Sequence, residues 1–141
     1  MSQSEAKIAT ILHDNSLSLT KQRQLVFELL EDSEPLSMHE LYALSKDSLD
    51  RASLYRTVSL FEKLGIIQRV NIGWKYKVEL SDSFAGHHHH LTCLKCHKVI
   101  PINEAELEAF IGSVAASHNF RPLEHQVEIQ GVCRLCAVGS N

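Results

Sequence analysis

The sequence lacks the features that would place the chain in a membrane or outside the cell. Its 141 residues are 44% hydrophobic, yet they include no apolar run long enough to cross a bilayer, so we expect no membrane span. No apolar leader precedes the cysteines, and the expected compartment is therefore the reducing cytoplasm. With a net charge of −3, the chain also lacks the excess of positive charge that is typical of a general nucleic-acid binder.

Positive charge is nevertheless concentrated in one segment. From Arg51 to Lys77 there are six basic residues and a single acid, Glu62, so this segment carries +5 and the rest of the chain −8. A local excess of this kind favours docking onto a partner of opposite charge.

Local capping signals predict the helices of the first half. Residues 3–14 have weak helical character, and Thr20 is a plausible N-cap for a helix that ends near Ser33. Ser37 and Glu40 form a capping box at the start of a short helix.

A third helix is predicted between Asp50, which caps it, and Gly65, which stops it. One face is apolar and is expected to pack inward. The outward face combines small residues, an aromatic residue and positive charges: Ala52, Tyr55, Arg56, Ser59 and Lys63. Small side chains permit close approach, while Arg and Tyr reach phosphates or base edges. An ordinary solvated helix is the alternative interpretation of this face.

The next segment, residues 66–80, alternates in polarity and contains Asn71-Ile72-Gly73, which is typical of a β-hairpin turn. Three helices followed by a hairpin is the order of a winged helix. In that fold the third helix enters the major groove of DNA, and the hairpin, here with Arg69, Lys75 and Lys77, contacts the backbone.

Potential metal ligands are concentrated in the second half. Four histidines, residues 87–90, lead into a pair formed by Cys93 and Cys96, and a second pair, Cys133 and Cys136, lies near the end. Paired thiolates suit a closed tetrahedral zinc site, and imidazole suits zinc, iron, copper or nickel. In an extended segment the odd- and even-numbered histidines point to opposite faces and serve two different sites. A tag remnant, a solvated loop and two disulfides are the alternatives.

The remaining elements form a small α/β region. Residues 81–86 are a predicted hinge, the histidines form a strand, and another strand follows near residues 98–102. Asn103 with Glu106 predicts a helix cap, and a last strand covers residues 125–131. The helix carries an apolar stripe that we expect to be core: Leu107, Phe110, Ile111 and Val114.

We therefore expect an α+β chain with a winged-helix DNA-binding domain over residues 1–80, a hinge over residues 81–86 and a small α/β dimerisation and metal-binding domain over residues 87–141. A sheet of so few strands buries its face better against a second copy, which favours a homodimer.

This order resembles the ferric uptake regulator family of bacterial metal-dependent repressors, over nearly the whole chain. The most specific matches are A-S-L-Y-R-T-V-x-x-F at residues 52–61 and H-H-H-H-L-T-C-L-K-C at residues 87–96. The resemblance implies a homodimer that binds a palindromic double-stranded DNA operator, with a structural zinc and one or two further metal sites.

The resemblance also implies roles for individual residues. The structural zinc ligands would be Cys93, Cys96, Cys133 and Cys136. A site within the dimerisation domain would use His87, His89, Glu108 and His125. A regulatory site at the hinge would use Glu79, His88 and His90. We expect DNA contacts from Arg23, Arg51, Ser53, Tyr55, Arg56, Lys75 and Lys77.

Two positions depart from the family pattern. Many iron- and peroxide-sensing members have a histidine where this chain has Pro35 and an acid where it has Pro101. The hinge site then lacks a fourth ligand, for which Gln68, Asn71 or His39 could substitute. Because zinc accepts four mixed nitrogen and oxygen ligands, zinc sensing is favoured over iron or manganese.

The expected function is therefore a metal-responsive repressor of metal-homeostasis genes, not an enzyme, in which metal at the hinge locks the dimer for operator binding. The expected cofactor is Zn²⁺, structural and regulatory, with Fe²⁺ or Mn²⁺ as regulatory alternatives. The competing hypotheses are a zinc or nickel store or chaperone without DNA binding, a redox sensor, and a zinc hydrolase, for which no H-E-x-x-H motif is present.

Overall fold

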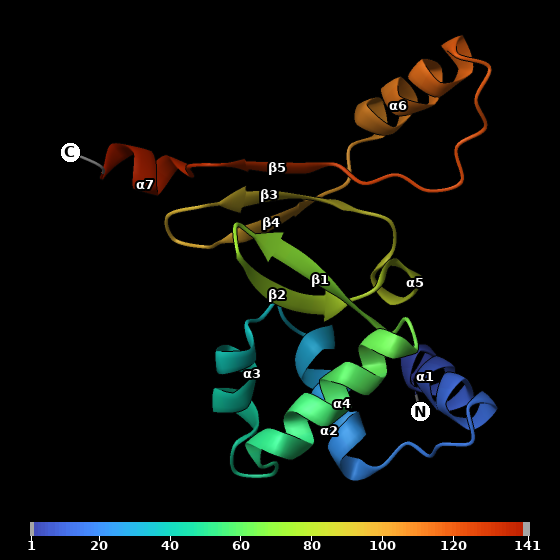
Figure 1. Cartoon of the computed structure of the whole chain (residues 1–141), viewed down its shortest axis with the longest axis vertical. Coiled ribbons are helices and arrows are strands. Elements are labelled where there is room, and N and C mark those ends of the chain that lie inside the picture. The colour runs from blue at the N-terminus through green and yellow to red at the C-terminus, as the bar shows by residue number, and fades with distance from the viewer. Residues whose placement is uncertain (1, 140–141) are drawn as a thin grey trace. The chain divides into compact units, whose positions relative to one another are not determined.

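The computed structural model describes residues 2–139, and the chain divides between Gly86 and His87 into two compact units (Figure 1). The first unit contains α1 (Gln3–Asp14), α2 (Lys21–Glu31), α3 (Met38–Ser45), α4 (Arg51–Lys63), β1 (Ile67–Ile72), β2 (Lys75–Leu80) and α5 (Asp82–Ala85). The order α2, α3, α4 and then the β1–β2 hairpin confirms the predicted winged helix. Among residues 2–139 no helix is long and apolar enough to cross a bilayer.

The predicted helix caps are present. Thr20 accepts a hydrogen bond from the Arg23 backbone N–H at 3.2 Å and begins α2. The Ser37 hydroxyl accepts from the Glu40 N–H at 3.0 Å, and the Glu40 carboxylate accepts from the Ser37 N–H at 3.3 Å, so the capping box of α3 is complete. These bonds satisfy backbone donors that the first turn of a helix leaves without partners.

The hairpin forms as predicted, but its turn lies further along the chain. Strands β1 and β2 are antiparallel and stay paired up to Ile72 opposite Lys75. The turn is therefore Gly73-Trp74, whereas Asn71 belongs to β1. Gly73 has φ +62°, which suits the first position of a two-residue hairpin turn.

The core of the first unit lies between the helices and the hairpin. Phe27 of α2 and Phe61 of α4 are fully buried in it. Phe84, in the segment predicted as a hinge, lies in α5 and packs edge-on against Phe27 with ring centroids 5.4 Å apart. Lys7 of α1 lies over the Phe84 ring and donates to the Ser83 carbonyl. Residues 82–85 are thus a helical turn anchored to the first unit.

The second unit is built on a three-stranded sheet in the order β4-β3-β5. Its elements are β3 (His89–Cys93), β4 (Val99–Ile102), α6 (Ala105–Ser117), β5 (Glu128–Gly131) and α7 (Arg134–Val138). The central strand β3 pairs antiparallel with β4 and parallel with β5. The predicted α+β class is therefore confirmed.

Two strand boundaries differ from the prediction. Strand β3 begins at His89, so His87 precedes the strand. Strand β5 begins at Glu128, and His125 lies in the loop before it. The alternating pattern extends beyond the residues that form ladder hydrogen bonds, and for this reason both strands were predicted to be longer than they are.

Helix α6 also differs from the prediction. Glu104 precedes it without a side-chain cap bond, so Asn103 is not the cap. The stripe expected as core is not buried within one chain: Phe110 is 66% and Val114 45% exposed. The small sheet has too little area to cover this helix face.

The capping box of α3 is coupled to the wing by charge. Lys77 of β2 lies 3.4 Å from the Glu40 carboxylate. Burial raises the pKa of Glu40, but the hydrogen bonds from Ser37 and the positive charge of Lys77 outweigh it, so this pKa lies below its ordinary value.

Because the folded-state pKa of Glu40 is lowered, its charge stabilises the fold above the unfolded-state pKa of about 4.3, and this contribution is lost as pH falls through the folded value. We predict that Glu40→Gln, which keeps a capping side chain, lowers the free energy of unfolding near neutral pH. The difference from wild type should shrink in acid. Urea unfolding of both proteins across this range tests it; a constant difference would contradict it.

Candidate metal centres and nucleic-acid interface

Four thiols converge in the second unit. Cys93 ends β3, Cys96 follows in the adjoining turn, and Cys133 and Cys136 lie at the start of α7 and within it. Their sulfur atoms all lie within 4.8 Å of one another. All four cysteines are free, which argues against the disulfide alternative.

The spacing and electrostatics of these sulfurs fit a divalent cation. Zn–S bonds of 2.3 Å at tetrahedral angles separate the sulfurs by about 3.8 Å, and the Cys96 and Cys133 sulfurs are 3.8 Å apart. Hydrogen bonds from the backbone N–H groups of Cys96 and Cys133 lower the pKa of Cys93 to about 6. The hydrogen bond to the Cys133 sulfur raises the pKa of Cys136 to about 12. The fold thus favours the thiolate of Cys93, whereas Cys136 needs a nearby positive charge to ionise.

The odd-numbered histidines form a second cluster with a carboxylate. Glu108 of α6 accepts from His89 at 2.6 Å and lies 2.7 Å from His125 and 3.3 Å from His87. The Nε2 atoms of His87 and His125 are 3.0 Å apart. The structure thus brings together all four residues of the predicted site in the dimerisation domain, from β3 and the segment before it, α6 and the loop before β5.

Backbone contacts orient this cluster. His89 is 1% exposed, and its Nδ1 accepts a hydrogen bond from the Val127 backbone N–H at 3.1 Å. This contact holds the ring so that Nε2 points at the carboxylate of Glu108. Burial raises the pKa of Glu108, but hydrogen bonds from His89 and His125 outweigh it and leave this pKa below its ordinary value. An ionised carboxylate among imidazoles fits zinc, iron or manganese. Nothing in the sequence predicted the hydrogen bond between Val127 and His89.

The even-numbered histidines also pair. The rings of His88 and His90 are 4.8 Å apart, and His90 Nδ1 lies 2.8 Å from the carboxylate of Glu128 on β5. The sequence analysis did not predict a role for Glu128, because its contact with His90 depends on the register of β5 against β3. In the first unit, Glu79 of β2 accepts from Gln68 at 2.8 Å.

The residues suggested as substitute ligands occupy different places in the first unit. Gln68 lies on β1 and holds the carboxylate of Glu79. Asn71 pairs with Tyr76 across the hairpin, and His39 is exposed in the first turn of α3. Of these candidates, Gln68 is the one that donates a hydrogen bond to Glu79.

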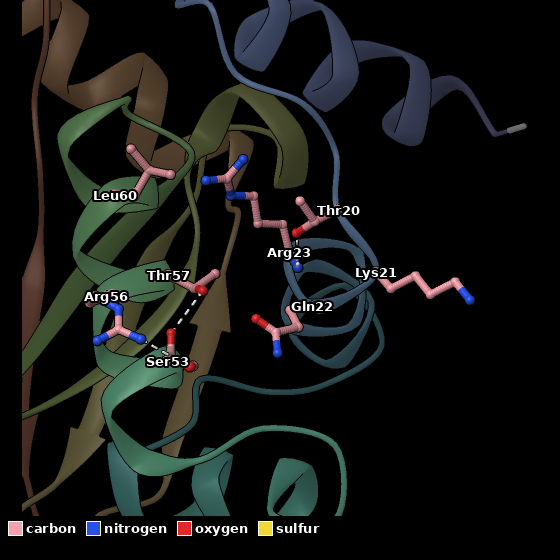
Figure 2. A pocket seen from close by; sticks show the side chains of 8 residues that line it. All are labelled: Thr20, Lys21, Gln22, Arg23, Ser53, Arg56, Thr57 and Leu60. Atoms are coloured by element: carbon pink, nitrogen blue, oxygen red, sulfur yellow. Dashed lines mark hydrogen bonds between the residues drawn. The ribbon is translucent and has the colours of Figure 1, made fainter.

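Three of the predicted DNA-binding residues, Arg23, Ser53 and Arg56, line a pocket between α2 and α4 with a cavity of about 550 Å³ (Figure 2). Arg23 donates to the Ser18 carbonyl at 2.6 Å, and Arg56 donates to the Ser53 hydroxyl at 3.1 Å. In Figure 2 the amide of Gln22 points into this gap, and Lys21 extends away from it. Two guanidinium groups and several polar side chains here suit phosphate oxygens.

The other predicted DNA contacts differ in availability. Lys75 and Tyr55 are exposed, the latter by 43%. Arg51 lies over the ring of Tyr42, with its guanidinium carbon 4.5 Å from the centroid. Lys77 is only 16% exposed and is paired with Glu40, so its charge is largely offset.

A winged helix joined to a small unit with a four-thiol cluster and a histidine–carboxylate cluster defines a metal-responsive transcriptional regulator. The model of the ferric uptake regulator family matches residues 14–130. The chain therefore belongs to this family.

Individual relatives agree. The ferric uptake regulation protein of Bacillus subtilis is 31% identical over 137 residues, covering 92% of each chain. That of Shigella flexneri is 34% identical over 130 residues, covering 88% of this chain and 86% of its own.

Solved structures show the same fold. The Vibrio cholerae ferric uptake regulator superposes with a TM-score of 0.72 at 30% identity and covers 88% of this chain and 98% of its own. A zinc-bound manganese uptake regulator superposes with a TM-score of 0.70 at 33% identity, with coverage of 88% and 96%.

We predict that Cys93→Ser with Cys96→Ser removes tightly bound zinc and unfolds or monomerises the second unit, because structural zinc contributes folding energy directly. Elemental analysis and circular dichroism of protein purified without added metal measure both effects. The matched variant His87→Ala with His125→Ala should keep the zinc held by the four cysteines. Retention of zinc and of a folded second unit by the cysteine variant would contradict the prediction.

Proposed function

We propose that this chain is a zinc-sensing repressor of metal-homeostasis genes, with iron or manganese as the alternative regulatory ion. The observation that carries the proposal is the presence of two distinct donor clusters, four thiols and three imidazoles with a carboxylate, in a chain whose first unit is a winged helix. Donor sets of different chemistry suit different ions: four thiols suit a structural zinc, and imidazoles with a carboxylate suit zinc, iron or manganese.

The four cysteines would hold a structural zinc. Cys93 and Cys96 come from the end of β3 and the turn after it, while Cys133 and Cys136 come from the start of α7 and from within it. An ion bound by both pairs would tie these segments together, which stabilises a sheet that buries little apolar surface of its own.

The regulatory ion would bind Glu79, His88 and His90 at the hinge. His90 is oriented by Glu128 and Glu79 by Gln68, so neither side chain would have to search for its position. An ion bound by residues on both sides of the hinge would favour one angle between the units. It would shift the equilibrium between angles by its differential affinity for that one.

The choice of zinc rests on two positions. Pro35 and Pro101 stand where a histidine and an acid occur in many iron- and peroxide-sensing relatives. A site with fewer protein ligands suits the four-coordinate preference of zinc better than six-coordinate iron or manganese.

The second unit would dimerise through its uncovered apolar surface. Strand β5 is at the edge of the sheet, and large apolar side chains of α6, of β5 and of the segment after it are exposed: Phe110, Val114, Ile129, Val132 and Leu135. Packing against a second copy would bury them. Two α4 helices related by two-fold symmetry would then meet half-sites about 34 Å apart on DNA.

A gel shift tests the regulatory proposal. We expect wild type to bind a duplex selected from a random pool weakly without added metal, and zinc to tighten binding by about 5- to 150-fold, the usual range of coupling between two sites. The variant His88→Ala with His90→Ala should lose this tightening and keep its cysteine-bound zinc.

The control is His13→Ala, because the His13 side chain is 91% exposed and far from these clusters in the sequence. It should respond to zinc as wild type does. The gating mechanism fails if the His88/His90 variant without zinc binds as tightly as wild type with zinc. Absence of DNA binding in every metal state would favour a metal store or chaperone.

Dimerisation gives a separate prediction. Phe110→Asp places a charge in the proposed interface and should convert the dimer to a monomer in sedimentation analysis, since burying an unpaired charge is costly. Phe110→Leu keeps an apolar side chain and should remain dimeric. A monomeric wild type, or a Phe110→Asp variant as dimeric as wild type, would refute this interface.

A further inference from the structure

The tip of the wing carries an exposed aromatic residue that the functions above do not use. Trp74 is the single tryptophan of the chain and is 89% exposed. It occupies the second position of the Gly73-Trp74 turn, where small polar residues are the usual choice. The strands beneath it are paired along their whole length, so the hairpin holds the base of this side chain in place.

Trp74 borders a cleft of about 290 Å³. The hairpin contributes Trp74, Lys75 and Tyr76, α4 contributes Tyr55, and Met38 lies at the start of α3. The cleft therefore joins the wing to the outward face of the helix proposed to enter the major groove. It is lined mainly by aromatic rings, with a single ammonium group.

The charge of the cleft comes from Lys75. Its ammonium lies 5.1 Å from the Trp74 ring centroid, and no acid in the part of the chain the structure describes forms an ion pair with it. The nearby cations differ: Arg69 is paired with Glu62 at 2.9 Å, and Lys77 is paired with Glu40 at 3.4 Å. Lys75 is thus available to an anion beside an uncovered ring.

We propose that Trp74 and Lys75 clamp the sugar–phosphate backbone of duplex DNA next to the groove occupied by α4. A DNA strand alternates apolar deoxyribose faces with anionic phosphates, and the cleft offers an aromatic face beside a cation. Continuity with Tyr55 on α4 favours DNA over an acidic peptide or an anionic membrane. This inference rests on the DNA-binding function proposed above, and it adds a contact that positions the protein without reading sequence.

The single tryptophan makes the contact directly measurable. Zinc-loaded wild type is titrated with the selected duplex while tryptophan emission and gel shift are recorded together. We expect the emission to be quenched and to shift to the blue, with the same midpoint as the gel shift. DNA binding with unchanged emission would overturn this inference and leave the proposed function intact; no DNA binding at all would overturn both.

Two further titrations test the occupant. Polyglutamate and vesicles that contain phosphatidylserine offer an acidic polypeptide and an anionic membrane surface. Neither should change the emission at concentrations where the duplex does. A larger response to either one than to DNA would overturn the assignment of the cleft to DNA.

Variants separate the two halves of the clamp. Trp74→Ala should weaken binding about fivefold or more, the lower end of what aromatic contacts to nucleic acids contribute, and Trp74→Phe should restore most of it. Lys75→Gln should reduce the slope of log affinity against log salt by about 1. The matched control is Leu44→Ala, because Leu44 is 59% exposed on α3 but does not line the cleft. Wild-type affinity for Trp74→Ala, with its fold verified by circular dichroism, would overturn the proposal.

Discussion

The second unit depends on the hydrogen bonding of β3 to both of its neighbours. Parallel pairing with β5 sets His90 opposite Glu128 and Cys93 opposite Gly131, two residues before Cys133. The same register lets the Val127 backbone N–H reach His89. One strand alignment therefore orients an odd-numbered histidine, an even-numbered histidine and the first cysteine, and a shift by one residue would exchange the two faces.

This arrangement leaves the second unit with few buried apolar side chains. Its side chains that are buried include His89, His90 and Thr92, while α6 and β5 bury no residue completely. A sheet with so little apolar burial has little free energy of its own against chain entropy. The proposed structural ion and the proposed second copy would both add to this small free energy of folding. Folding, assembly and metal binding would therefore be linked in one unit.

Local and distant interactions differ in how well the sequence predicted them. The caps at Thr20 and Ser37 were predictable because each bond joins residues three positions apart. His87 groups with His89 as the alternation predicted, although β3 begins only at His89. By contrast, the contact of Glu128 with His90 spans 38 positions and depends on strand register, and Asn103 failed as a cap because α6 begins after the extended residue Glu104. Spacing in the sequence constrains neighbours on one element, whereas tertiary packing selects the partners.

The distribution of charge on the hairpin has a consequence for recognition. Of its three cations, Arg69 and Lys77 are neutralised by acids of α4 and α3, so they fasten the wing to the helices. The stacking of Arg69 over Tyr76, 4.0 Å from the ring centroid, adds to this rigidity. A wing held in this way keeps Lys75 and Trp74 at a constant distance from Tyr55. Contacts at fixed spacing lose less entropy on binding than flexible ones. Arg69 and Lys77 would therefore support DNA binding indirectly, by holding Lys75 in position.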